Sequence, residues 1–285
     1  MGGAGGGEKF FWSRSNTVSD PRVLFFAPGD SLDAEESQES FPASNSGVEL
    51  NSTTTKFHST SMFFNGVSKI EFTGVPSGYG PGTYDFTFEA WVYALKINSS
   101  FFLMAGGKRS DMFIGSDGVP PHGIGIGRTQ VAWDTKAQTE LPNGRWVHVA
   151  VVRESGTLNI YYDGQRQHNV PNSQKYVFTD GKIILGFESA YFNGYMEEVL
   201  LSKYARYSGE SFAVPSSPTD IRVKGEIVEY VVSDNRNAYP ENGIADDGYF
   251  YERIEPVEEL KQKDASIQLM EKTLNVLGVQ TRWEE

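Results

Sequence analysis

Short strand-like segments joined by tight-turn dipeptides constrain the fold of this chain more than any other feature of its sequence. From Asn143 to Gly164 the dipeptides Asn-Gly, Ser-Gly and Asp-Gly flank two segments, 145–153 and 157–162, that are rich in Val, Ile and Tyr. These dipeptides adopt the backbone of two-residue hairpin turns, and β-branched and aromatic residues favour strands. The region therefore predicts consecutive antiparallel hairpins, a β-meander.

Comparable segments recur along the chain and predict a sandwich of two sheets. Residues 86–93 place Phe86 and Phe88 on one strand face and Glu89 and Trp91 on the other, so both faces carry bulky side chains. Such a strand fits the centre of a sheet that is covered on both sides. The other predicted strands are 23–27, 61–64, 69–72, 182–186 and 192–201. With 30 glycines and 13 prolines to supply turns, the pattern indicates an all-β antiparallel sandwich.

Composition and charge exclude several classes of protein. The absence of cysteine excludes disulfides, zinc-thiolate sites and a cysteine nucleophile, and only four histidines argue against a multi-histidine metal centre. A formal net charge of -12 argues against binding to nucleic acid or to an anionic membrane, because both need a basic surface. The chain has no apolar stretch of bilayer-spanning length, and its glycine-rich start lacks the apolar core of a signal peptide. We therefore expect cytoplasmic synthesis without a cleaved signal and without membrane insertion.

Changes in composition divide the chain into four expected parts. Residues 1–21 form an N-terminal arm, 22–215 the sandwich, 216–254 a small β-ribbon, and 255–285 a helix and tail. The arm contains an aromatic cluster that would be adhesive if it were left in solvent. This cluster consists of Phe10, Phe11 and Trp12. Two interpretations stay open: the arm packs on a neighbouring molecule, or it is the first strand of the protein's own sheet.

An amphipathic helix is predicted near the C-terminus. Glu255-Pro256 is a typical helix start, and Gly278 is a typical helix end. Apolar residues seven apart form a seam of about two and a half heptads, too short to be stable as an isolated helix in water. The helix is therefore expected to pack on its own domain, on a partner or around an oligomer axis. With the arm cluster, the expected assembly residues are Leu260, Ile267, Met270, Leu274 and Leu277.

Four blocks of sequence follow one another in a recognisable order and spacing. They are 85–92 (DFTFEAWV), 144–150 (GRWVHVA), 158–164 (LNIYYDG) and 192–199 (FNGYMEEV). Together they resemble the laminin-G-like jelly roll of the concanavalin A-like lectin/glucanase superfamily, over about residues 22–215. The resemblance implies a jelly-roll sandwich of the kind found in lectins. One departure is Glu197-Glu198, where the family usually has Asp followed by Glu.

A second, shorter resemblance lies downstream of the sandwich. Residues 224–233 form a strand-like segment, a Tyr-Pro-Glu-Asn-Gly turn follows at 239–243, and alternating aromatics follow at 247–252. Two turns that flank alternating aromatics predict a small ribbon. The arrangement is similar to a strand-turn-aromatic segment that recurs in bacteriophage tail and fibre proteins, and this resemblance implies a virion protein.

The sequence contains no recognisable catalytic arrangement. Retaining glycosidases need two carboxyl groups about 5–5.5 Å apart, and no inner strand carries carboxylates at the alternate positions that would supply them. Glu197 and Glu198 are adjacent, so we expect one in a hydrogen-bonded structural role and the other in solvent. His148 alternates with valines and is interpreted as structural, as is the glycine-rich stretch 123–127, which no helix follows. We therefore expect no enzymatic activity.

Calcium is the cofactor that the resemblance implies. Laminin-G-like and related lectin domains often hold Ca²⁺ with loop carboxylates, and Ca²⁺ takes hard oxygen ligands. The candidate ligands are Asp111, Asp117 and Asp134. No EF-hand spacing is present, and aspartates in loops also act simply as turn formers, so that alternative stays open.

Glycan binding needs an exposed aromatic ring beside hydrogen-bonding side chains, because the apolar face of a sugar stacks on a ring. Two predicted loops have this composition. The candidates are Trp133 with Asp134 and Arg128, and Tyr191 with Asn193. The alternative in each case is an aromatic side chain that folds back into its own sandwich.

The combined observations favour a non-enzymatic structural protein of a bacteriophage particle: an appendage, fibre or decoration protein of the virion whose lectin-like sandwich binds glycans. The expected partners are other virion proteins, further copies of the chain and a host-surface glycan, with no nucleic acid and no membrane insertion. Two alternatives stay open. A stand-alone carbohydrate-binding module would be monomeric, and a glycan-cleaving enzyme would depend on one inner-face carboxylate.

Overall fold

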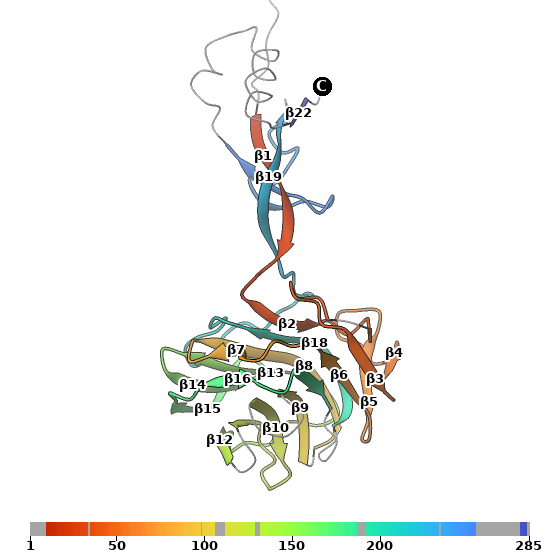
Figure 1. Ribbon diagram of the computed structural model, residues 1–285, viewed down its shortest axis with the longest axis vertical. Helices are drawn as coiled ribbons and strands as arrows, with labels where there is room; N and C mark the ends of the chain where they lie inside the picture. Colours follow the sequence, from red (N-terminus) through yellow and green to blue (C-terminus); the bar gives the residue numbers. More distant parts are fainter. Residues whose placement is uncertain are drawn as a thin grey trace, which may run out of the picture. The chain divides into compact units, whose positions relative to one another are not determined.

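The chain folds into two compact β-sheet units. We call them the sandwich unit (Asp20–Ile221) and the terminal unit (Met1–Ser19 with Arg222–Glu285). The computed structural model describes residues 10–33, 35–97, 99–105, 112–128, 132–186, 192–233, 235–254 and 280–283. Every regular element in these ranges is a β-strand (Figure 1). No helix within them is long and apolar enough to cross a membrane.

Two large antiparallel sheets form the sandwich unit. The strands of the eight-stranded sheet are, in order, β15 (Gln165–Pro171), β14 (Thr157–Tyr162), β13 (Trp146–Glu154), β8 (Phe86–Lys96), β18 (Asn193–Ser202), β5 (Ser61–Asn65) and β4 (Glu49–Asn51), with β2 (Val23–Ala27) paired to β18. The strands of the seven-stranded sheet are β12 (Ala132–Lys136), β11 (Gly125–Arg128), β10 (Met112–Asp117), β9 (Ser99–Ala105), β17 (Lys182–Leu185), β6 (Lys69–Thr73) and β3 (Ala43–Ser46). A small ribbon pairs β7 (Tyr79–Gly82) with β16 (Tyr176–Phe178).

The predicted hairpins and the predicted all-β antiparallel sandwich are confirmed. Strands β13, β14 and β15 form a meander. Its turns use Ser155-Gly156 and Asp163-Gly164, which all have positive φ angles, as tight hairpin turns require. The short, local signal of the turn dipeptides was therefore sufficient to locate these strands.

The core lies between the two sheets and receives alternate residues of each strand. In β8, Phe88 and Val92 point into it and are fully buried, as are Phe72 of β6 and Leu185 of β17 from the opposite sheet. Burying one such side chain contributes about 1.5–3 kcal/mol. Glu89, on the other face of β8, is also buried. The prediction that this strand is covered on both sides is thus confirmed.

A segment that we call the strap, residues 203–214, covers part of the outer face of the eight-stranded sheet, the face turned away from the core. The hydroxyl of Thr87 in β8 donates to the carbonyl of Tyr204 in the strap over 3.0 Å. Further along, the Phe212 ring lies edge-on to Tyr161 of β14, 5.1 Å between centroids. The strap therefore covers the outer face at one end of β8, β13 and β14. It makes no described contact with that face at the other end of these strands.

Both ends of the chain build the five-stranded sheet of the terminal unit. Its strands are, in order, β20 (Asn242–Ile244), β21 (Phe250–Arg253), β1 (Phe10–Ser19), β19 (Arg222–Ser233) and β22 (Gln280–Trp283), with β22 parallel to β19 and the other pairs antiparallel. The aromatic cluster of the arm thus belongs to a strand of the protein's own sheet, the second of the two interpretations.

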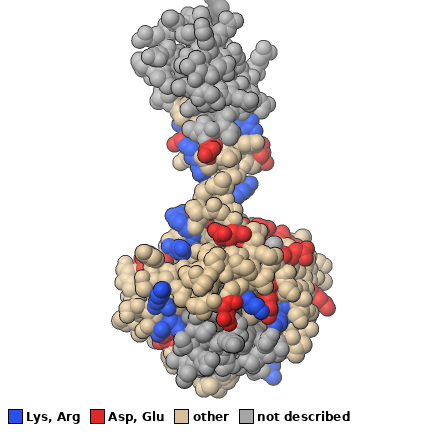
Figure 2. Space-filling model, in the orientation of Figure 1, with Lys and Arg blue, Asp and Glu red and all other residues tan. Residues whose placement is uncertain are grey.

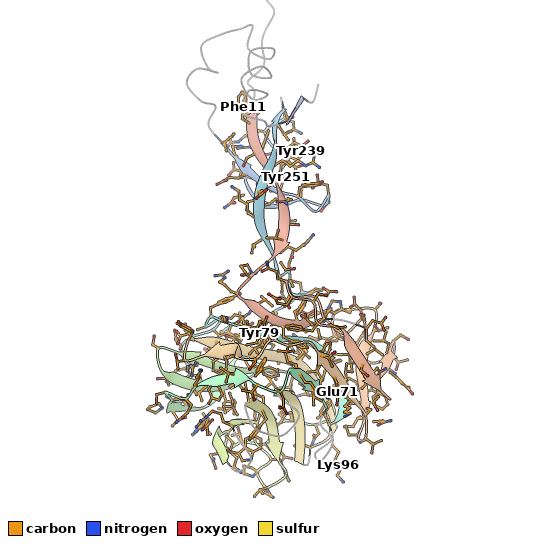
Figure 3. All side chains as sticks on the ribbon, in the orientation of Figure 1. Phe11, Glu71, Tyr79, Lys96, Tyr239 and Tyr251 are labelled. Carbon is orange, nitrogen blue, oxygen red and sulfur yellow. The ribbon has the colours of Figure 1, made fainter. Side chains whose placement is uncertain are left out.

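Aromatic packing holds the terminal unit together. Trp12 is fully buried, and its ring lies edge-on to Tyr239 at 5.5 Å. Tyr239 in turn stacks on Tyr251 at 4.2 Å, and Figure 3 labels both residues in the terminal unit. The guanidinium of Arg253 lies 5.1 Å from the Trp12 ring centre. The predicted helix and its seam lie outside the described residues, including Leu260, Ile267, Met270, Leu274 and Leu277.

Candidate functional site

Four aromatic residues form a straight row across the outer face of the eight-stranded sheet. Phe63 of β5 lies opposite Tyr195 of β18, Tyr195 lies opposite Tyr93 of β8, and Tyr93 lies opposite Trp146 of β13. Directly opposed residues in antiparallel strands have their side chains on the same face of the sheet. All four are partly exposed, whereas the residue that follows each of them in the chain is in the core. We call this set the aromatic row.

The rings of the aromatic row support one another. The centroids of Phe63 and Tyr195 are 4.9 Å apart, those of Tyr195 and Tyr93 5.7 Å, and those of Tyr93 and Trp146 5.8 Å. The last two pairs meet edge to face. These distances lie in the favourable range for aromatic pairs, so the rings are held in place before any ligand arrives. Three inter-strand spacings make the row roughly 14 Å long.

Amide side chains continue the outer face beside the row. Asn65 and Asn193 lie opposite each other, two residues along from Phe63 and Tyr195 on their strands. Asn65 is exposed and Asn193 is partly exposed. A carboxamide both donates and accepts hydrogen bonds, which suits the hydroxyl groups of a sugar. Asn193, predicted from the sequence as a glycan contact, is therefore next to the aromatic row, whereas its predicted partner Tyr191 lies outside the described residues.

On the other side of the row, a lysine lies against a buried indole. The ammonium of Lys56 is 3.9 Å from the ring centre of Trp91, which is two residues before Tyr93 on β8 and only 4% exposed. The Trp91 ring also meets Phe57 edge to face at 5.7 Å. Cation–π contact of this kind stabilises the lysine position.

Glu197 and Glu198 are both buried, so the prediction that one of them faces solvent is wrong. Glu198 has a φ of 56° and lies at a register shift between β18 and β8. At a bulge of this type, two adjacent side chains no longer point to opposite faces of the sheet. Glu197 accepts the N–H groups of Lys56 (2.5 Å), Phe57 (2.9 Å) and His58 (3.2 Å). Its carboxylate thereby fixes the loop that carries Lys56.

The second carboxylate, Glu198, joins two other segments. It accepts the N–H of Thr219 over 2.6 Å and makes a short hydrogen bond with Nε2 of His58. The positive φ at Glu198 is unusual for a residue with a side chain, and such strain persists only where the surroundings enforce it. Here these two contacts enforce it, and both carboxylates therefore have structural roles beside the row.

A charged cluster lies beneath the strap on the same face. Glu89 of β8 is 3.4 Å from Nε2 of His148 and 2.8 Å from Nε of Arg206 in the strap. Burial alone would raise the pKa of Glu89, but the hydrogen bond from His148 and the charge of Arg206 hold that pKa below its ordinary value. Burial alone would lower the pKa of Arg206, but the negative charge of Glu89 raises that pKa above its ordinary value. His148 is thus buried against Glu89, in agreement with the structural role expected for it.

The other predicted glycan residues come together in the seven-stranded sheet but pair with one another. Asp134 accepts two hydrogen bonds from the guanidinium of Arg128, both of 3.0 Å, and one from the hydroxyl of Tyr176, also of 3.0 Å. This pairing raises the pKa of Arg128. The neighbouring Trp133 meets Phe113 edge to face at 4.8 Å. The polar groups of this set are engaged internally, so the aromatic row is the better site.

The calcium prediction stays a prediction. Asp111 lies outside the described residues, Asp117 ends β10, and Asp134 is bound to Arg128 as above. A carboxylate that accepts two guanidinium hydrogen bonds has lost much of its capacity to bind a cation. Across the described ranges, no three acidic or histidine side chains approach closely enough to hold a metal ion.

The aromatic row was not predicted from the sequence, although every strand that contributes to it was. Phe63, Tyr93, Trp146 and Tyr195 each occupy a polar-side position in a strand with an apolar inner face. An aromatic residue at such a position in each of several strands is the signal that could have found the row. The alignment of the four depends on strand order, which adjacent sequence does not contain.

Comparisons with known proteins concern the sandwich unit. A laminin G model described as Concanavalin A-like lectin/glucanases superfamily matches residues 64–210. No curated protein sequence matches the chain. Among solved structures, the chain is similar to domain 4 of AbnA, an extracellular arabinanase from Geobacillus stearothermophilus, in complex with arabinotriose. The identity is 16%, the TM-score is 0.47, and the match covers 68% of this chain and 94% of the other.

Two further solved structures are similar to the chain at low identity. A structure described as HCR/D-Sa-GBL1/C has 12% identity and a TM-score of 0.50, with 65% of this chain and 48% of the other covered. A putative carbohydrate binding protein from Bacteroides ovatus has 19% identity and a TM-score of 0.42, with 57% and 50% covered. The chain thus spans about half the length of these two proteins, and the likeness concerns the fold alone.

Proposed function

The chain belongs to the concanavalin A-like lectin/glucanases superfamily through residues 64–210, and from this premise we propose that its sandwich unit is a non-enzymatic glycan-binding module of a bacteriophage particle. The aromatic row carries the glycan-binding part of this proposal. Sugars present apolar C–H faces that stack on aromatic rings, and their hydroxyl groups bond to amides such as Asn193. Because the rings already support one another, binding requires little further ordering of side chains.

A glycan array, followed by calorimetry with the best binder, tests the site. Replacing Tyr93 or Trp146 with alanine is expected to lower affinity at least about tenfold, because buried aromatic anchors dominate binding energies. Tyr84→Ala is the matched control. Tyr84 is 72% exposed and precedes the start of β8, whereas Tyr93 lies near the end of that strand. Equal losses in all three variants, or none in the row variants, would contradict the assignment.

The absence of enzymatic activity is part of the same proposal. The buried carboxylates nearest to the row are engaged: Glu197 by three backbone N–H groups, Glu198 by His58 and Thr219, and Glu89 by Arg206. A general acid or nucleophile needs an oxygen that is free to reach the substrate. Incubation with the bound glycan should therefore leave its chain length unchanged in mass spectra. Shortened products that disappear in a Glu197→Gln variant would refute this part.

The placement in a virion is supported by the terminal unit. Its segment 224–252 is the one that resembles bacteriophage tail and fibre proteins, and its sheet and aromatic packing form a unit separate from the sandwich. We infer that this unit attaches the chain to other virion proteins or to further copies of itself. The sandwich unit then meets a host-surface glycan. The assignment includes no nucleic-acid partner and no membrane insertion.

Light scattering tests the assembly part of the proposal. The full chain is expected to be an oligomer, and a version that ends at Glu255 is expected to dissociate, because the truncation removes the predicted helix together with the edge strand β22. Circular dichroism must show that the truncated chain keeps its β-sheets. A monomeric full chain that still binds glycan would instead indicate a stand-alone carbohydrate-binding module.

A further inference from the structure

We propose that the aromatic row takes acidic oligosaccharides, whose anionic groups are met by Lys56 on one flank of the row and by Lys96 on the other. This inference rests on the proposed glycan-binding function and adds the chemical class of the ligand. It is carried by two cations that have no acidic partner among the residues that the structure describes and that lie beside a row of partly exposed rings.

Lys56 is a fixed cation at the edge of the row. Its ammonium lies 3.9 Å from the ring centre of Trp91 and 5.2 Å from that of Phe57. Its backbone N–H donates a hydrogen bond of 2.5 Å to the carboxylate of Glu197. Within the described part of the chain, the ammonium contacts these rings and forms no ion pair. An ammonium that is already in position gains a charge-assisted hydrogen bond from an incoming carboxylate at little entropic cost.

Lys96 is a second cation on the opposite flank. It is the last residue of β8, and its pairing partner on β18 is Asn193. Its side chain is exposed, and Figure 3 labels it in the sandwich unit. No ion pair to it is present among the described residues. Lys56 and Lys96 therefore lie on the two sides of Tyr93. Tyr93 and Tyr195 are the two central rings of the row.

The acidic groups around the row do not cancel these two charges. Glu197 is fully buried, and its oxygens accept backbone N–H groups. Asp163, near the Trp146 end, is already paired with Arg145 at 2.7 Å. Asp30 lies 3.8 Å from Nδ1 of His58. Glu49 is exposed and lies opposite Phe63 at the far end of the row. An anionic group is therefore expected near Tyr93 and not near Phe63.

The local charge differs from the charge of the whole chain. The net charge of -12 repels anions in general, and acidic and basic side chains are interspersed on the visible face of the sandwich unit (Figure 2). Screening in salt limits the repulsion from distant acids to about 8–10 Å, whereas a ligand on the row meets the two lysines directly. The two lysines beside the row, and not the net charge of the chain, therefore decide the preference for acidic over neutral glycans.

An array of matched glycans tests the inference. Each acidic oligosaccharide is paired with its neutral counterpart of the same backbone: galacturonate oligomers with their methyl esters, and sialylated glycans with their desialylated forms. The acidic member is expected to bind several-fold more tightly, with a preference that weakens as salt is added. Lys56→Gln and Lys96→Gln should each lower the affinity for the acidic member roughly two- to fivefold and leave the neutral member unchanged. Lys175→Gln, an exposed lysine in the loop before β16, is the control.

Each outcome of this experiment has a definite meaning. Neutral glycans that bind as tightly as their acidic counterparts, with losses in the Tyr93→Ala variant, would overturn the acidic preference and keep the proposed glycan-binding site. Equal effects of Lys56→Gln on both members of a pair would also overturn it, because the lysine would then act through packing alone. An array without any binder overturns both the inference and the proposed function.

Discussion

Replacing Glu89 with glutamine tests whether the charged cluster beneath the strap fastens that segment to the sheet. Glu89 has a side chain that is only 3% exposed, and it lies 2.8 Å from Arg206 and 3.4 Å from His148. Glutamine keeps the shape of the side chain and removes its charge. The guanidinium of Arg206, which belongs to the strap, would then lose its nearest counter-ion.

The expected loss in the free energy of unfolding is about 3 kcal/mol. Removing one partner of a buried ion pair costs about 3–5 kcal/mol. The lower end applies here, because the side chain of Arg206 is 20% exposed and water can partly solvate it. The loss is a large fraction of the stability of an ordinary domain, which is about 5–15 kcal/mol. Replacing Glu89 by leucine and Arg206 by methionine together should cost less than the single change, since no lone charge remains.

Urea denaturation followed by tryptophan fluorescence measures this loss, with Glu140→Gln as the control at an exposed loop position. The pH dependence provides a second readout. The pKa of Glu89 is lower in the folded state than its ordinary value of 4.5, so its contribution is present above about pH 4.5 and is lost as the pH falls through the folded value. The gap between the native protein and Glu89→Gln should therefore narrow on acidification.

Two results would refute this reasoning. A loss below about 1 kcal/mol at neutral pH would show that water compensates Arg206 and that the cluster does not hold the strap. A gap that stays constant on acidification would show that glutamine acts through packing and not through charge. Proteolysis within the strap, faster in Glu89→Gln than in the native protein, would independently identify the segment that is released.

Three further changes test other contacts. Glu197→Gln should lose about 2 kcal/mol in the same denaturation assay, because three backbone N–H groups lose a charged acceptor. Gly164→Ala should lower the free energy of unfolding by more than about 2 kcal/mol, since the added Cβ would lie 2.1 Å from the carbonyl oxygen of Phe212. Gly156→Ala is the control: the space around it is open, so it should cost only the left-handed backbone strain, about 1 kcal/mol. Arg153→Lys should lower the melting temperature by several degrees, because one ammonium cannot reach the three carbonyl groups that the buried guanidinium binds; an unchanged melting temperature would contradict this.

The sequence predicted the strands well and the environment of single polar residues less well. Turn dipeptides and alternation identified β8, β13, β14 and β18 because both signals act between neighbouring residues. The same alternation failed at Glu198, where a bulge with a φ of 56° interrupts it and buries both glutamates. A bulge depends on the partner strand, and a single sequence does not contain that information.

Two of the aromatic groups singled out from the sequence had outcomes that follow from one physical reason. Trp12 is adhesive in isolation, and the structure buries it against Tyr239 within the terminal unit. Trp133 has polar neighbours suited to a sugar, but Arg128 and Asp134 pair with each other. Composition shows what a side chain can bind, whereas only its neighbours in space show what it already binds.

What the sequence by itself determined is the local part of this protein: an all-β antiparallel sandwich, the positions of its strands and turns, and a family resemblance over about residues 22–215. Turn chemistry and side-chain period are properties of a few adjacent residues, so they can be recognised without a partner strand. The tertiary structure decided the candidate site. Phe63 and Tyr195 are far apart in the chain and meet only because β5 and β18 are neighbours in one register. Register is set by the packing of the whole sheet, and a shift of one residue would turn these rings into the core.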